Sequence, residues 1–204
     1  MRSTTPKDLS GHCPRCLLRL EICMCAAIPR VETRVELLIV QHVTELRLTS
    51  NTGRLAALAL PKARIESYGG GEPFDGSVLL AEPAALLYSA AASGPSTQAS
   101  ELPNITKLVV LDGSFRQARR MYKRIHALRQ LPELALPAPS VAPHRLRQPP
   151  HEGGMSTLEA IAHALALLEG PEVAAPLHAL QAEFVHRMDN LRGRRRDALG
   201  RGIN

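Results

Sequence analysis

The sequence predicts an α/β domain with a mainly parallel sheet, preceded by a small cysteine-rich module. Two nearly continuous apolar runs, residues 35–40 (VELLIV) and 107–112 (KLVVLD), contain β-branched residues and are typical of buried parallel strands. A helical pattern follows each run, and strands that alternate with helices favour a parallel sheet. The 204 residues, 45% of them hydrophobic, suffice for one main core but not for two large domains.

All four cysteines lie in one short stretch, as Cys13-Pro-Arg-Cys16 and Cys23-Met-Cys25. Two close pairs of thiolates can surround one tetrahedral zinc ion. The alternative is two disulfides, which are rare in an intracellular protein, and the chain shows no secretion signal. We therefore expect a structural zinc site in a module that spans residues 1–30.

One helix and three short strands are expected between the two apolar runs. Asn51 and its neighbours offer N-cap side chains before the apolar LAALAL, and Pro61 stops this helix. The short strands are expected at residues 63–68, 77–80 and 85–88. The small, polar, Pro-containing segment 90–103 is expected to be an exposed loop.

The second apolar run is followed by a helix expected over residues 114–130. Its apolar positions recur at helical spacing, at Phe115, Ala118, Tyr122, Ile125 and Leu128. The other face is cationic and includes Arg116, Arg119, Arg120, Lys123 and Arg124, with no Asp or Glu between residues 114 and 130. Such a face suits phosphates, although a solvated helix face is the common alternative.

Two further helices are expected before a basic tail at residues 193–204. Ser156 and Glu159 have the spacing of a capping box at a helix start. Gly170-Pro171 closes that helix, and a last helix is expected over residues 173–191.

Four motifs in this order resemble the DTW-domain proteins: the cysteine pairs, Asn51-Thr52-Gly53-Arg54, residues 111–118 (LDGSFRQA) and residues 156–160 (STLEA). The family's Asp-Thr-Trp, often with an inserted Gly, is replaced here by residues 112–115 (DGSF). Acid, hydroxyl and aromatic ring are kept, whereas the indole N–H is lost.

The resemblance implies a tRNA-uridine aminocarboxypropyltransferase, which transfers the 3-amino-3-carboxypropyl group of S-adenosylmethionine to N3 of a uridine. It also implies a SPOUT-like domain over residues 31–192 with a knotted C-terminal half, which the general rarity of knots would not suggest. Two alternatives stay open: a SPOUT-like RNA methyltransferase with the same cofactor, and a non-catalytic zinc-containing RNA-binding protein.

Asp112 ends a predicted strand, where function tends to lie in α/β folds, and is the candidate base that removes the N3 proton. The alternative is that it caps the following helix. His42, at the end of the first predicted strand, receives no catalytic role. We expect cofactor contacts from Leu80, Leu111, Gly113, Ser114, Ser156 and Thr157, the last two at a helix N-terminus that also suits a capping box. We expect RNA contacts from Asn51, Thr52, Arg54, Arg116, Gln117, Arg119, Lys123 and Arg145.

The formal net charge of +6 and the pI near 9.5 fit a polyanionic partner such as tRNA. Aromatic residues make up only 3% of the chain, without Trp, which disfavours RNA binding on a platform of stacked rings. No apolar run approaches the roughly 18 residues of a membrane span. We therefore expect a cytoplasmic protein that does not bind a membrane, and we infer no obligate protein partner.

Overall fold

The computed structural model describes residues 8–71, 73–87, 97–102, 104–137 and 154–191. Its centre is a sheet of four parallel strands in the order β2-β1-β4-β3. The strands are β1 (Glu36–His42), β2 (Ala63–Tyr68), β3 (Ala84–Leu87) and β4 (Lys107–Asp112). In register, Gln41 pairs with Asp112 and His42 with Tyr68, so the carboxyl ends of β1, β2 and β4 meet at one edge.

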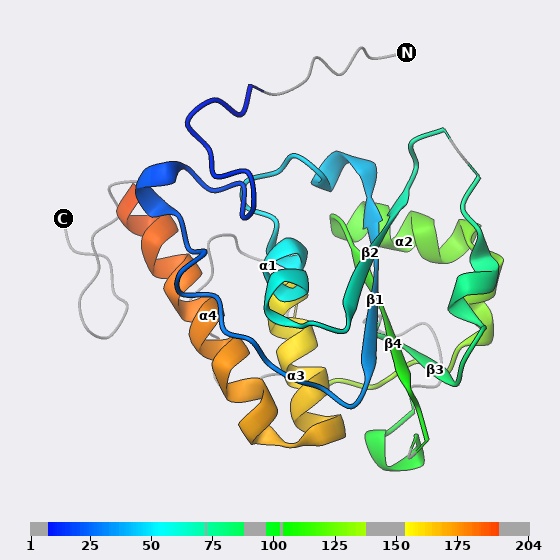
Figure 1. The fold of residues 1–204 in the computed structure, drawn as a ribbon. Helices are drawn as coiled ribbons and strands as arrows, with labels where there is room; N and C mark the ends of the chain where they lie inside the picture. The colour runs from blue at the N-terminus through cyan, green and yellow to red at the C-terminus, as the bar shows by residue number, and fades with distance from the viewer. Residues whose placement is uncertain (1–7, 72, 88–96, 103, 138–153, 192–204) are drawn as a thin grey trace.

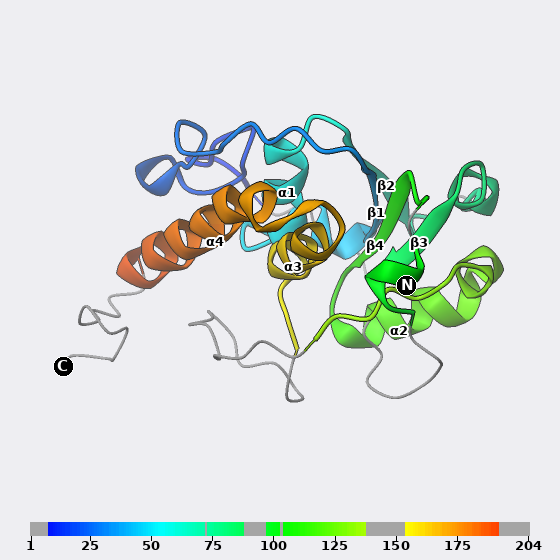
Figure 2. The same cartoon turned by 90° about the horizontal axis from the view of Figure 1, so that it is seen from below.

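Helices cover both faces of the sheet, as Figures 1 and 2 show. α1 (Thr52–Ala59), α3 (Thr157–Glu169) and α4 (Pro171–Leu191) lie on one face, and α2 (Phe115–Arg124) lies on the other. The alternation along β4 follows these layers: Leu108 and Val110 belong to the core under α1, α3 and α4, whereas Val109 and Leu111 belong to the core under α2. The side chain of Asp112 therefore points to the face of α1 and α3.

Side-chain caps fix where three of the helices begin. Asn51 accepts a hydrogen bond from the Arg54 amide at the start of α1. Ser114 and Ser156 each form a capping box, with Gln117 in α2 and Glu159 in α3. The positive φ of Gly170 (112°) then ends α3, which confirms the predicted boundary.

The N-terminal module packs against the domain beside α1 and the C-terminal part of α4 (Figure 1). Cys13, Cys16, Leu18 and Met24 are buried in the same core cluster as α1, α3 and α4. Arg187 of α4 also donates to the Cys23 carbonyl at 2.5 Å. The module and the domain thus share one core.

The strand predicted at residues 77–80 is wrong, because Gly76–Leu79 forms a 3-10 helix. The Asp75 carboxylate accepts from the Ser77 amide and caps this turn. The buried ammonium group of Lys107 stabilises the same turn by donating a hydrogen bond to the Val78 carbonyl at 3.3 Å.

The helix predicted over residues 114–130 is shorter than expected. α2 ends at Arg124, and His126–Gln130 forms a 3-10 helix, because Ile125 leaves the helical region with ψ at 97°. Phe115, expected in the core, is 41% exposed, and Met121 occupies the fully buried position instead.

Parts of the prediction lie outside the described residues: most of segment 90–103, the basic tail and residues 138–153. A knot in the C-terminal half would depend on the course of residues 88–96 and 138–153, so it stays a prediction. Among the helices of the described residues, none is long and apolar enough to cross a membrane.

Candidate active site and metal centre

The carboxylate of Asp112 joins three segments of the chain at the carboxyl edge of the sheet. One oxygen, Oδ2, accepts hydrogen bonds from Gln41 Nε2 at 2.6 Å and Asn51 Nδ2 at 2.7 Å. The other, Oδ1, accepts from the Thr157 hydroxyl at 2.6 Å. Asp112 is only 2% exposed, and its three partners come from the end of β1, the N-cap of α1 and the first turn of α3. We call these four side chains the Asp112 cluster.

The residues next to Asn51 fit closely around this cluster. A Cβ on Gly53 would lie 2.7 Å from the Asp112 carboxyl carbon, so the carboxylate fits only against a glycine. The Thr52 hydroxyl accepts from the Leu158 amide at 3.4 Å and links the starts of α1 and α3. Two helix N-termini therefore meet beside one buried carboxylate, where their partial positive charge stabilises an anion.

Asp112 does not cap the helix that follows it, which was the alternative reading of its position. Ser114 caps α2: Gln117 Oε1 accepts from the Ser114 amide at 2.7 Å and from its hydroxyl at 2.8 Å. The Asp112 carboxylate does not face open space: it is buried and enclosed by its three donors.

A second polar group lies at the same edge, around His42. Gln117 Nε2 donates to the Thr44 hydroxyl at 2.7 Å and lies 3.4 Å from His42 Nδ1. The imidazole also stacks at a tilt against Tyr68, with ring centroids 6.3 Å apart. Burial and the nearby positive charge of Arg120 lower the pKa of His42 below its ordinary value, so the imidazole is neutral at physiological pH.

The exposed face of α2 is strongly cationic. Five basic side chains line a shallow, open hollow of about 410 Å³: Arg116, Arg119, Arg120, Lys123 and Arg124. Among the described residues, none of the five forms an ion pair with an acidic side chain. A surface of this kind attracts phosphates.

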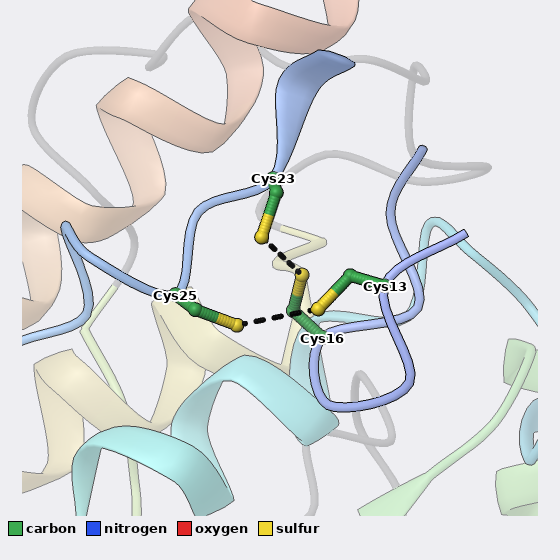
Figure 3. A group of neighbouring side chains, drawn as sticks. All are labelled: Cys13, Cys16, Cys23 and Cys25. Carbon is green, nitrogen blue, oxygen red and sulfur yellow. Dashed lines mark hydrogen bonds between the residues drawn. The ribbon is translucent and has the colours of Figure 1, made fainter. Parts of the chain in front are cut away.

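The four cysteines meet in the N-terminal module, as the spacing predicted, with their sulfur atoms directed toward one another (Figure 3). The Sγ atoms of Cys13 and Cys25 are 3.5 Å apart, those of Cys16 and Cys23 are 3.8 Å apart, and all four lie within 4.8 Å. Tetrahedral zinc with Zn–S bonds of about 2.3 Å requires a sulfur spacing of about 3.8 Å, so the cluster fits this ion.

The chemistry of the four thiols also suits a cation. Hydrogen bonds from the backbone of Cys16 and Arg15 lower the pKa of Cys13 to about 6. Burial, together with the neighbouring thiols, raises the pKa of Cys25 to about 12. A central divalent cation would supply the positive charge that buried thiolates need.

Most of the residues expected to form the site lie at the carboxyl edge of the sheet, although their neighbours differ from one residue to the next. Gly113 and Ser114 lie in the turn after β4, and Ser156 and Thr157 start α3 beside the Asp112 cluster. Leu111 is buried under α2.

Two expected residues are placed elsewhere. Leu80 follows a turn that packs on Lys107, the first residue of β4, and so lies toward the opposite edge of the sheet. Arg54 is half-buried and donates to the carbonyls of Leu46 and Leu48, which occupies much of its guanidinium. Arg145 lies outside the described residues.

Sequence reasoning missed Gln41 and Gly53 and gave His42 no role. Gln41 stands at the end of an apolar strand. A buried polar residue is uncommon there and indicates a specific role, so the sequence did contain a signal for Gln41. Gly53 lies in the motif of residues 51–54, but its role was not predicted, because only the fold brings the Asp112 carboxylate against it. Arg120 and Arg124 were counted as part of the cationic face but were not named as RNA contacts.

Comparison with known proteins agrees with the order of the motifs. The family model described as the DTW domain matches residues 10–189. Among curated proteins, the chain is similar to tRNA-uridine aminocarboxypropyltransferase 2 of Drosophila melanogaster. The two are 30% identical over 192 residues, which cover 87% of this chain and 76% of the relative. No solved structure matches the chain.

Proposed function

The chain belongs to the DTW domain family, and on that premise we propose that it transfers the 3-amino-3-carboxypropyl group of S-adenosylmethionine to N3 of a uridine in tRNA. One structural observation supports the proposal in addition to family membership. Three motifs that are far apart in sequence, around Asn51, Asp112 and Thr157, meet in one buried cluster. Polar convergence at the carboxyl edge of a parallel sheet is typical of an active site.

The reaction is a displacement at carbon. Uridine N3 attacks the carbon of the aminocarboxypropyl chain that is bonded to sulfur, the C–S bond breaks, and its electron pair stays on sulfur. The N3 proton is released, and methylthioadenosine is the leaving group. Because uridine N3 is a weak acid, the protein must place the two substrates and stabilise the charge that develops on the uracil.

S-adenosylmethionine supplies the activated carbon when it is bound. We propose that the turn after β4 and the start of α3 hold it, through Leu111, Gly113, Ser114, Ser156 and Thr157. The N-terminus of α3 favours the methionine carboxylate. Leu80 is left out of this site, because it lies toward the other edge.

For Asp112, the geometry supports a positioning role more strongly than proton transfer. Its carboxylate is enclosed and already accepts three hydrogen bonds, two of them on Oδ2. Its bonds fix the N-cap of α1 and the first turn of α3, and those elements form the walls of the proposed site. Because the carboxylate is only 2% exposed, a uridine could reach it only after the surrounding side chains move.

We propose that the cationic face of α2 binds tRNA phosphates, with Arg116, Arg119 and Lys123 joined by Arg120 and Arg124. This face begins two residues after Ser114, so phosphates held there bring a nucleotide to the carboxyl edge. We assign a role in shaping the site to Asn51, Thr52 and Gln117, because their side chains form hydrogen bonds within it.

The finer fold and metal assignments belong to the same proposal. The parallel sheet, with a C-terminal helix returning to its carboxyl edge, supports a SPOUT relationship. The fit of the four sulfur atoms supports a structural zinc ion at Cys13, Cys16, Cys23 and Cys25. A tRNA-modifying activity of this kind supports a cytoplasmic location.

Labelled S-adenosylmethionine tests the reaction. Purified protein is incubated with tRNA and cofactor labelled either in the methyl group or in the carboxypropyl carbons. We expect only the carboxypropyl label to enter tRNA, and nucleoside mass spectrometry to locate it on uridine. Methyl label in tRNA would support a methyltransferase instead, and tRNA binding without incorporation of either label would support a non-catalytic RNA-binding protein.

A further inference from the structure

His42 lies directly beside the proposed reaction site. It is the last residue of β1, next to Gln41 of the Asp112 cluster. A Cβ added to Gly113 would come within 3.5 Å of the His42 Cβ, so the imidazole adjoins the turn after β4. Because successive side chains of a strand alternate, the imidazole lies on the α2 side of this edge, whereas the Gln41 side chain lies on the α1 and α3 side.

The surroundings of His42 determine which ring nitrogen carries the proton. The Thr44 amide, which can only donate, points to Nδ1 at 3.3 Å, and the Thr44 hydroxyl lies 2.9 Å from the same atom. Gln117 offers its amide N–H from 3.4 Å, because its oxygen is held by Ser114. With donors gathered at Nδ1, that atom accepts, and the proton of the neutral ring is on Nε2.

The Nε2 side of the ring is approachable. His42 is only partly buried, and Gly69, whose Cβ would lie 3.4 Å from Nε2, adds no side chain on that side of the ring. The groups that face the ring are Tyr68 from β2, Gln117 and the charge of Arg120 from α2, and Thr44. A substrate atom that reaches the exposed part of the ring at Nε2 would therefore meet an N–H donor.

We propose that His42 is a catalytic residue whose neutral Nε2–H donates a hydrogen bond to a uracil carbonyl next to N3. This inference rests on the proposed function. As the N3 proton leaves to water and the N3–C bond forms, negative charge spreads from N3 to the adjacent carbonyl oxygens. A fixed donor at one of these oxygens stabilises that charge and eases the loss of the N3 proton as the new bond forms.

The cationic face of α2 lies near His42 and can orient a nucleotide toward the imidazole. Arg120 belongs to that face and is close enough to His42 to affect its pKa. A phosphate held at Arg120 would therefore place its nucleotide near the imidazole. The backbone contact and the base contact then come from neighbouring elements, α2 and β1.

Two substitutions separate the catalytic role from a structural one. His42→Asn keeps an amide at the position of Nδ1, so it can still cap Thr44, but it removes the group at Nε2. His42→Gln places an amide N–H near the position of Nε2. His186→Asn, at an exposed position on α4, is the matched control.

We expect His42→Asn to lower kcat about 100-fold, the loss typical of one removed donor to a developing charge. Its melting temperature and its Kd for tRNA should stay at the wild-type values. His42→Gln should recover at least about tenfold of that loss. With tRNA that contains 5-fluorouridine, whose N3 is more acidic, the defect of His42→Asn should shrink.

Wild-type kcat in His42→Asn would overturn the inference, as would an equal loss in both variants together with a lower melting temperature. An equal defect on uridine and 5-fluorouridine would also count against charge stabilisation. If the wild-type protein itself incorporates no carboxypropyl label, the proposed function fails, which is a separate outcome.

Discussion

Asp112 accepts hydrogen bonds from two amide groups and one hydroxyl. An asparagine in its place can satisfy all three partners: its oxygen accepts from Gln41 and Asn51, and its NH₂ donates to the Thr157 hydroxyl, which can rotate to accept. We therefore expect Asp112→Asn to keep the fold and to retain activity within about tenfold, whereas loss of a general base costs about 10²- to 10⁴-fold. The measurement is kcat by transfer of the carboxypropyl label.

Asp112→Ala serves as the comparison, because it removes all three bonds together. It should lower both kcat and the melting temperature. If Asp112→Asn instead folds normally and is as inactive as the alanine variant, the carboxylate has a chemical role, and the positioning assignment is wrong.

Gly53 illustrates a second constraint at the scale of one residue. A methyl group there would lie 2.7 Å from the Asp112 carboxyl carbon, far inside contact distance. We expect Gly53→Ala to lower the free energy of unfolding by about 1–3 kcal/mol, as overpacking does, and to reduce kcat by displacing Asp112. Urea denaturation measures the first effect. Gly70→Ala is the control, since its nearest neighbour would be 3.4 Å away; similar losses in both variants would refute the explanation.

At the scale of elements, α2 has a face with five cationic side chains that meet no described acid. If it holds tRNA phosphates, Arg119→Gln combined with Lys123→Gln should weaken tRNA binding for every sequence tested. The slope of log K against log salt concentration should fall by about 1 for each phosphate that the variant no longer neutralises. Titration of tRNA at several salt concentrations checks this.

Lys62→Gln is the charge-matched control for Lys123→Gln alone, since each removes one positive charge. It removes a cation from an exposed position between α1 and β2, on another part of the molecule. An unchanged slope in the α2 variant, or an equal change in the Lys62 variant, would mean that this face does not bind tRNA specifically.

Strands and helices could be predicted from the sequence wherever the hydrophobic pattern alone determines them. The strands expected at residues 63–68 and 107–112 match β2 and β4. β4 is buried at every position, as strands inside a parallel sheet are, whereas β2 is an edge strand without a buried residue. The run at 77–80 is equally apolar but forms a 3-10 turn, since Asp75 caps it and Lys107 holds it. Those tertiary contacts cannot be read from periodicity.

The candidate site was predictable only in part for the same reason. Asp112 and Thr157 were named as single positions, each at the end of a predicted element. Their partnership was not predicted, because Gln41, Asn51 and Thr157 lie 71, 61 and 45 residues from Asp112 in sequence. Local sequence patterns do not show which strand and helix ends, distant in sequence, lie together in the fold.

At the scale of the whole molecule, the cysteine cluster joins the N-terminal module to α4 and the main core. If zinc fills it, the purified protein should contain one zinc ion per chain. Removal of the metal by a chelator, or the substitution Cys16→Ser, should lower the free energy of unfolding by more than about 4 kcal/mol, as loss of a structural metal does.

Metal analysis and thermal denaturation measure these two effects. Ser3→Ala, in the same N-terminal region but outside the cysteine pairs, is the control and should leave both unchanged. Metal-free protein with an unaltered melting temperature would show that the cluster is not a structural zinc site.

The separation in sequence of the partners of Asp112 has a consequence for how the protein is made. During synthesis, the sheet and α2 emerge before α3, so the carboxylate is laid down beside Gln41 and Asn51 while the Thr157 hydroxyl is still missing. A chain that stalls on the ribosome before residue 157 would therefore contain all four strands and the turn after β4, yet lack the hydroxyl that donates to Asp112 Oδ1 and so an essential part of the proposed site.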